Sequence, residues 1–210
     1  FDNLDKYADG KQITYSVDEN PVSEYQSSVS GYDITNTYTP GKISIPIKKL
    51  WDDGDDQDGK RPEEIVITLL VNGEETDRKL ILNAGNNWQG RFEDLDEYAA
   101  GNQILYSVKE EEVPGYRISI DGSADEGFVI TNKHTPEKIG ISGSKTWDDA
   151  DDQDGKRPES ITVNLYADGT KADSKTVTTA DGWQWTFDDL DKYADGKLIT
   201  YSVEENPVSE

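Results

Sequence analysis

The amino-acid sequence predicts an all-β fold of tandem antiparallel β-sandwiches, each with about seven strands. Three observations lead to this prediction. Apolar and polar residues alternate with a period of two in most segments, and turn-forming residues separate those segments. No segment carries a long stripe of apolar residues at helical spacing. Motifs also recur at a spacing of about one small domain, which indicates several sandwiches in a row rather than one larger fold.

The repeats divide the chain into three predicted domains. Segment 51–63 recurs at 147–159 with one substitution and an offset of 96 residues. Residues 1–24 match residues 187–210 at 21 of 24 positions, so the first and third repeats are near copies and the middle one has diverged. On this pattern we expect the parent protein to continue beyond Glu210 with a segment similar to residues 25–32. Short proline-containing boundaries predict residues 1–40 as the C-terminal part of one repeat, 41–136 as a complete repeat, and 137–210 as the N-terminal part of a third.

Within the complete repeat, each strand is predicted from its own alternation. The first strand has isoleucine at every second position, and the next two form a hairpin around the turn pair Asn72–Gly73. The third repeat has the same order of elements. We expect strands over 43–51, 65–71, 88–92, 104–110 and 128–132, and a short helical turn over 95–98.

Composition excludes several classes of function. The chain has 210 residues and a formal charge of −23, which disfavours binding to the phosphates of nucleic acids. It has no apolar run long enough to span a membrane. The absence of cysteine excludes disulfides and thiolate sites, and the single histidine, His134, disfavours a histidine-ligated metal or a Ser-His-Asp triad. We therefore expect no cofactor and no metal.

The acidic loop at 54–59 has some of the residues of a calcium-binding loop. With Gly59 as the sixth position of an EF-hand loop, the first and twelfth positions hold Gly54 and Ile65, which are not ligands. A solvated acidic loop is the favoured interpretation, and weak calcium binding at its surface is left open.

Three polar residues of the complete repeat share a face with buried apolar residues. Lys49 shares a face with the isoleucines of the first strand, Glu110 with the apolar residues of the strand 104–110, and Asn132 with the apolar residues of the last strand. Burial lowers the pKa of a lysine and raises that of a glutamate, so the amine can become a nucleophile and the carboxyl can polarise the asparagine amide. Attack on that amide would expel ammonia and leave a crosslink. The alternative is a buried Lys–Glu ion pair that hydrogen-bonds the asparagine.

These motifs resemble the Cna B-type domains of Gram-positive surface proteins. The resemblance covers essentially the whole chain and is carried by segments 145–149, 154–158, 106–110 and 34–40. It implies a transthyretin-like or inverse immunoglobulin-like sandwich with a self-generated Lys–Asn isopeptide bond, assisted by an acidic residue.

Carried across, the resemblance implies that Lys49 is the reactive lysine, Glu110 the catalytic acid and Asn132 the acceptor. The first repeat has Glu19 and Asn36 at the matching positions, and the third has Lys145 and Glu205. The pair Lys48–Lys49 departs from the family's usual single lysine. The alternation of side chains along the strand places Lys49 on the buried face and predicts that Lys48 faces solvent. The separated groups also suggest a crosslink from Lys145 to Asn36 between copies of the chain.

The favoured function is a structural stalk segment of a cell-surface adhesin, anchored to the cell wall outside the cell. Its partners are the neighbouring repeats of the same chain and, through other domains, host extracellular matrix. Enzyme action on outside substrates is disfavoured, because Lys, Glu and Asn would be consumed in one intramolecular turnover. The alternative is a ligand-binding module for host matrix protein or glycan. The tryptophans fall on strand positions that are predicted to face the core, which favours a role in packing over a role in a carbohydrate site.

Overall fold

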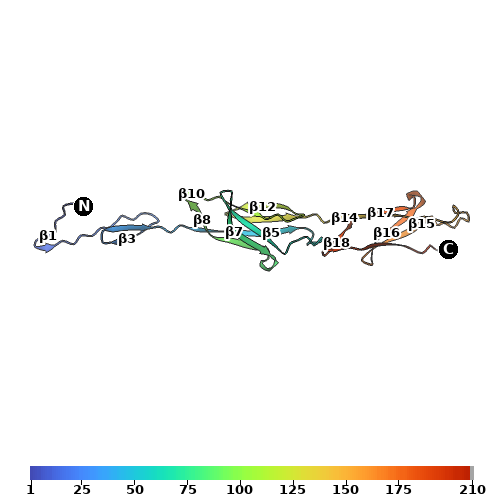
Figure 1. The fold of residues 1–210 in the computed structure, drawn as a ribbon, viewed down its shortest axis with the longest axis horizontal. Coiled ribbons are helices and arrows are strands. Elements are labelled where there is room, and N and C mark those ends of the chain that lie inside the picture. The colour runs from blue at the N-terminus through green and yellow to red at the C-terminus, as the bar shows by residue number, and fades with distance from the viewer. Residues whose placement is uncertain (209–210) are drawn as a thin grey trace. The chain divides into compact units, whose positions relative to one another are not determined.

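The computed structural model describes residues 1–208 and consists of β-strands with two three-residue 3-10 helices, Ala84–Asn86 and Thr179–Asp181 (Figure 1). The predicted all-β class is therefore confirmed. Residues 209 and 210, the last two of the third predicted repeat, lie outside the described residues. Between residues 1 and 208, no helix has the length and apolar character needed to cross a bilayer.

The chain forms two compact units, the first of which combines Phe1–Ile43 with Asp94–Gln103. The first unit is built from two-stranded ladders, and most of its side chains are exposed. Its strands are β1 (Tyr7–Ala8) with β2 (Lys11–Gln12), β3 (Gln26–Ser30) with β4 (Asp33–Thr37), and β9 (Tyr98–Ala99) with β10 (Asn102–Gln103).

The helical turn expected over 95–98 is wrong. Strand β8 (Gln89–Asp96) covers its first half, and β9 begins at its last residue, Tyr98. The turn between β9 and β10 consists of Ala100 and Gly101, with φ values of 48° and 79°. Positive φ at both central residues is typical of a two-residue hairpin, which continues the extended backbone instead of coiling it.

The second unit comprises Ser44–Glu93 and Ile104–Glu210 and contains two sandwich cores. In the first core, one sheet has the order β12-β13-β5-β8 and the other has the order β11-β6-β7. Inward side chains from both sheets are buried, among them Ile47 and Ile130 from one and Ile67 and Leu69 from the other. The strands are β5 (Lys42–Asp52), β6 (Glu64–Val71), β7 (Glu74–Asn83), β11 (Tyr106–Glu110), β12 (Arg117–Ser123) and β13 (Gly127–Lys133).

The first and last strands of this core run in the same direction. We expected antiparallel pairing throughout, but β13 lies parallel to β5, with Ile130 opposite Lys49 and Asn132 opposite Trp51. The ladders β11–β6, β12–β13 and β6–β7 are antiparallel, and the β6–β7 hairpin has its turn at Asn72–Gly73, as predicted. The parallel pair places alternate residues of β5 and β13 side by side on the buried face of one sheet.

The second core of this unit repeats the same plan with fewer strands. Its sheets have the orders β14-β17 and β16-β15-β20. Buried Leu165, Val177 and Phe187 are part of its centre. Up to residue 208, the chain after β20 contains no counterpart of β12 and β13. The strands are β14 (Lys138–Ser144), β15 (Ser160–Ala167), β16 (Thr170–Thr178), β17 (Gln184–Asp191), β18 (Tyr193–Ala194), β19 (Lys197–Leu198) and β20 (Tyr201–Glu205).

Candidate functional site

Lys49, Glu110 and Asn132 meet inside the first sandwich core. Lys49 projects from β5, Asn132 from its neighbour β13, and Glu110 from β11 in the facing sheet. The exposed fractions are 3% for Lys49, 5% for Glu110 and 0% for Asn132. The structure thus brings together all three side chains that sequence parity had singled out, and it leaves Lys48 exposed as predicted.

Both Lys49 and Asn132 bind the same carboxylate. Lys49 Nζ donates to Glu110 Oε2 at 2.8 Å and to Oε1 at 3.0 Å. Asn132 Nδ2 donates to Glu110 Oε1 at 2.8 Å. One carboxylate oxygen is therefore hydrogen-bonded by the amine and by the amide together, which holds the amine next to the amide.

The backbone around each group is fixed by the sheets. The amide of Lys49 donates to the carbonyl of Trp88 at 2.8 Å, and Glu110 is opposite Ile67 in the β11–β6 ladder. The Lys49 ammonium also lies 4.6 Å from the centre of the Trp51 ring. Sequence parity had assigned Trp51 to packing alone, although a cation placed over an indole is also attracted by the ring face.

Burial is the dominant influence on the protonation of Lys49. Desolvation lowers the pKa of Lys49, and the hydrogen bond and charge of Glu110 offset this effect only in part. A lowered pKa brings the neutral, nucleophilic amine closer to physiological pH.

The amide of Asn132 is oriented differently from the sequence-based expectation. We expected the carboxyl to hydrogen-bond the amide carbonyl, whereas the carboxylate accepts from Nδ2, and Oδ1 is buried without a hydrogen-bond partner. The observed orientation suits an ionised Glu110, which can only accept. A protonated Glu110 could donate to Oδ1 if the amide turned over, because O and N occupy equivalent positions in the side chain.

Each of the other repeats contributes part of the same arrangement. In the first unit, Asn36 Nδ2 donates to Glu19 Oε1 at 3.0 Å, and Ser27 Oγ donates to Glu19 Oε2 at 3.2 Å. In the second core of the other unit, Lys145 Nζ donates to Glu205 Oε2 at 2.9 Å, and these two side chains are 26% and 28% exposed. The amide–carboxylate contact and the amine–carboxylate contact therefore form separately.

A second buried polar cluster was missed by sequence reasoning. Asp53 accepts from Arg61 at 2.6 and 3.0 Å and from the Tyr116 hydroxyl at 2.9 Å. Burial acts to raise the pKa of Asp53, but hydrogen bonds, chiefly from Arg61, outweigh it and hold that pKa below its usual value. Asp53 lies one residue beyond the end of β5 at Asp52, although continuing the alternation of Lys49 and Trp51 by one step would have placed it on the buried face.

The acidic loop is less solvated than expected. Asp55 is exposed, but Asp53 and Asp58 are buried. Asp58 Oδ2 lies 2.8 Å from His134 Nε2 and accepts from the amide of Glu137 at 2.9 Å. The solvated-loop interpretation is therefore wrong for Asp58, and Asp53, which precedes the loop, is buried as well. Among residues 1–208, no group of three or more His, Asp and Glu side chains is arranged to hold a metal ion.

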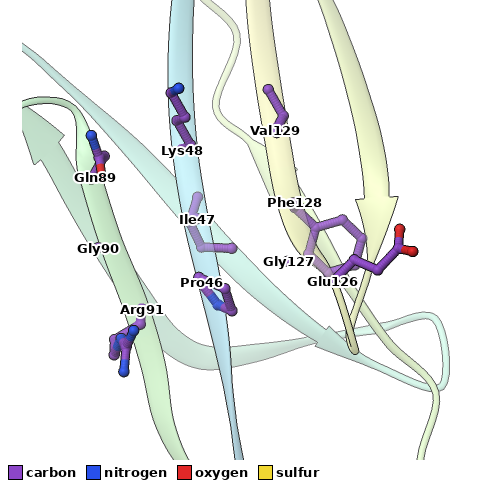
Figure 2. A pocket seen from close by; sticks show the side chains of 10 residues that line it. All are labelled: Pro46, Ile47, Lys48, Gln89, Gly90, Arg91, Glu126, Gly127, Phe128 and Val129. Atoms are coloured by element: carbon purple, nitrogen blue, oxygen red, sulfur yellow. The ribbon is translucent and has the colours of Figure 1, made fainter.

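An open cleft of about 480 Å³ lies along β5, β8 and the start of β13 (Figure 2). Its charged lining residues are Lys48, Arg91 and Glu126, and its one aromatic lining residue, Phe128, is buried. None of Lys49, Glu110 and Asn132 lines it. The cleft is thus separate from the candidate crosslinking groups.

Comparison with known proteins identifies the family. The Cna protein B-type domain matches residues 1–37, 45–133 and 141–210. A collagen adhesin of Staphylococcus aureus is 46% identical over 211 residues, which cover 100% of this chain and 18% of that protein. The crystal structure of two B repeat units of the collagen binding protein of Staphylococcus aureus has a TM-score of 0.73 and 45% identity, and the match covers 99% of this chain and 56% of that one. The predicted fold and resemblance are confirmed, and the chain belongs to the Cna protein B-type domain family.

Proposed function

We propose that this chain is a structural stalk segment of a bacterial cell-surface adhesin, stapled by an isopeptide bond between Lys49 and Asn132. The observation that carries the proposal is the shared, buried carboxylate of Glu110, which hydrogen-bonds the amine and the amide from two neighbouring strands. The proposal includes repeats bounded near residues 40 and 136, placed outside the cell and joined to the wall through other parts of the protein.

The chemistry needs no outside reactant. Glu110 accepts a proton from Lys49, and the neutral Nζ attacks Cγ of Asn132. A second proton passes from the attacking nitrogen to Nδ2, with Glu110 as the carrier. The Cγ–Nδ2 bond breaks, ammonia leaves, and the new Nζ–Cγ bond remains. Each site reacts once, so the chain is not proposed to be an enzyme. Packing in the core supplies the proximity that makes an amide reactive toward an amine.

The position of the bond suits a load-bearing segment. Lys49 and Asn132 lie on the first and last strands of the core, which are parallel neighbours. A pulling force that enters through β5 and leaves through β13 would pass through the new bond. The strands between them would then carry little of the load, which is the useful property in a stalk.

Ligand binding is less well supported than a structural role. Aromatic anchors are typical of glycan and protein recognition. The cleft of about 480 Å³ exposes no aromatic ring among its lining residues, whereas a second cleft of about 720 Å³ in the first unit is lined by the exposed residues Phe1, Tyr15 and Tyr32. The matched collagen adhesin carries collagen in its name, but this chain covers only 18% of it. We therefore assign contacts with host matrix to other domains of the parent protein, and contacts with neighbouring repeats to this chain.

Intact-mass measurement of the denatured chain tests the proposal. The wild-type monomer should weigh less than its sequence by one ammonia for the bond in the first core. Lys49→Ala and Asn132→Ala should restore that ammonia. Lys49→Arg should do the same, because a guanidinium keeps its charge and cannot attack. Lys48→Ala is the matched control, because the Lys48 side chain is exposed. This variant should still weigh one ammonia less than its sequence, as the wild type does. A wild-type chain at full sequence mass would contradict the proposed bond.

A further inference from the structure

Two polar atoms inside the first core are buried and have no hydrogen-bond partner. One is the acceptor Oδ1 of Asn132, and the other is the donor Nε1 of Trp51. An unsatisfied polar atom in a protein core costs free energy, so each such atom calls for an explanation, of which a catalytic role is one. An unsatisfied donor and an unsatisfied acceptor in the same core are candidates for a hydrogen bond that forms only during a reaction.

The register of the two strands places these groups beside each other. Asn132 of β13 is opposite Trp51 of β5, and paired residues of neighbouring strands point to the same face of the sheet. Lys49 lies two residues before Trp51 on β5 and shares that face. The indole is thus the neighbour of the amide on the adjacent strand, on the same side of the sheet as the attacking amine.

A series of contacts joins the indole to the reacting groups. The Nζ atom of Lys49 lies 4.6 Å from the centre of the Trp51 ring and 3.0 Å from Glu110 Oε1, which lies 2.8 Å from Asn132 Nδ2. An ionised Glu110 can only accept hydrogen bonds, so it binds the two nitrogens and has nothing to offer to Oδ1. The amide oxygen is therefore left for another donor.

The ring of Trp51 is held in place by its neighbours. Its centre lies 5.1 Å from the ring centres of Trp88 and Tyr116, and the ring planes are inclined to it by 76° and 74°. The guanidinium carbon of Arg61 lies 5.4 Å from the same ring. Edge-to-face packing of this kind fixes the plane of an indole and the direction of its N–H. A donor that is fixed before the reaction can stabilise developing charge without a cost of reorganisation.

The same arrangement recurs beside the lysine of the second core. Trp147 follows Lys145 by two residues, as Trp51 follows Lys49. The Nζ atom of Lys145 lies 4.7 Å from the centre of the Trp147 ring, and Nε1 of Trp147 is also buried without a hydrogen-bond partner. An unsatisfied indole donor thus accompanies the lysine in both cores.

We propose that Trp51 is a catalytic residue for the Lys49–Asn132 bond, and that its indole N–H donates to Oδ1 of Asn132 as negative charge develops there. The proposal rests on the Lys–Asn chemistry proposed above. Attack of the neutral Nζ on Cγ turns the amide carbon into a tetrahedral centre whose oxygen carries a negative charge. Trp51 hydrogen-bonds this oxygen and keeps its own proton, while Glu110 carries a proton from Nζ to Nδ2. The Cγ–Nδ2 bond then breaks, ammonia leaves, and the carbonyl forms again on the new amide.

This hydrogen bond acts on the rate because it is absent before the reaction. Neither atom is paired in the resting structure, so a bond made in the transition state lowers the barrier without stabilising the reactants. Removing one donor to such an oxygen slows acyl transfer by about 100-fold or more. The observed orientation of the Asn132 amide is sufficient for this role, and the amide does not need to turn over.

The rate of ammonia loss from the full chain tests the proposal. A short pulse of cell-free synthesis, stopped with an antibiotic, gives chains of one age, and intact mass then follows the loss of ammonia with time. Trp51→Phe keeps an aromatic ring without an N–H and should react about 100-fold more slowly than wild type. Trp185→Phe is the matched control, because it removes another buried, unpartnered indole N–H, in the second core. It should react at the wild-type rate.

A second replacement at position 51 separates the N–H from the shape of the ring. Benzothienylalanine has sulfur in place of the indole N–H and nearly the same shape as tryptophan. It should slow the reaction as much as Trp51→Phe does, whereas a role in packing alone predicts the wild-type rate. Protection of the β6 amides from hydrogen exchange shows that each variant has folded, since Ile65, Ile67 and Leu69 are buried there.

The outcomes separate this inference from the proposed bond. If wild type and both variants at position 51 lose ammonia at the same rate, the bond stands and the inference is wrong. If benzothienylalanine reacts as fast as wild type, or Trp185→Phe as slowly as Trp51→Phe, the indole N–H of Trp51 has no specific role and the inference is also wrong. If the wild-type chain loses no ammonia, the proposed bond fails and the inference fails with it.

Discussion

The double variant Lys49→Met/Glu110→Gln isolates the contribution of the proposed crosslink to stability. Both substitutions are close in volume to the original side chains, and removing both charges avoids an unpaired buried ion. The bond would join residues 83 positions apart. By analogy with a disulfide closing a loop of that length, it removes about 4.5 kcal/mol of unfolded-state entropy at 25 °C. The variant should be less stable by about that amount.

Hydrogen exchange monitored by mass spectrometry measures this change within the whole chain. A loss of about 4.5 kcal/mol corresponds to a roughly thousandfold faster exchange of amides that open only on unfolding of the core. The amides of β6 are suitable probes, because Ile65, Ile67 and Leu69 are buried there. Lys48→Met is the control and should leave β6 exchange unchanged. Wild-type exchange in the double variant, or an equal acceleration in the control, would refute the reasoning.

Two further predictions concern residues outside the crosslinking site. Asp53→Asn should cost about 2 kcal/mol at neutral pH, since it weakens charged hydrogen bonds to a buried carboxylate. The folded-state pKa of Asp53 is lowered, so its stabilisation is present above the ordinary value of 3.8 and is lost as pH falls below it. The difference in thermal midpoint between wild type and variant should therefore narrow as the pH falls below 3.8, and Asp55→Asn, whose side chain is exposed, is the control. Gly127→Ala should lower the urea midpoint more than Gly73→Ala. Both glycines have φ near 90°, but an added Cβ would lie 2.6 Å from Pro46 at position 127 and would meet nothing within 4 Å at position 73. The strain alone costs about 1–2 kcal/mol, and the clash adds about 1–3 kcal/mol. Equal midpoints for the two alanine variants would show that the close contact relaxes freely.

Alternation in the sequence was enough to predict the buried faces of the strands that carry the site in the first core. Lys49, Glu110 and Asn132 were found in this way, because a period of two fixes the side of the sheet on which each residue lies. Alternation was wrong for the first unit, where Ile34 and Asn36 were expected to face inward and are exposed. The same pattern carries no information on strand direction, so the parallel pairing of β5 and β13 was not predicted. The regular alternation of apolar and polar residues ends with the first strand and does not continue into the acidic loop. Asp53 is held by the nearby Arg61 and also by Tyr116, and Asp58 lies against His134. Tyr116 and His134 are distant in sequence and only the fold brings them near.

The three repeats together suggest why a lysine and a glutamate are placed in a sandwich core at all. A buried ion pair contributes little net stability, because desolvation of both charges offsets their attraction. In the second core, Lys145 and Glu205 form the same contact with about a quarter of each side chain exposed, so solvent still reaches the charges. In the first core, β13 covers the pair completely. The proposed reaction converts the ammonium of Lys49 into a neutral amide and removes its share of the desolvation cost. The strand that buries the pair in the first core is thus the strand that supplies Asn132, whose reaction would relieve part of the cost of burial.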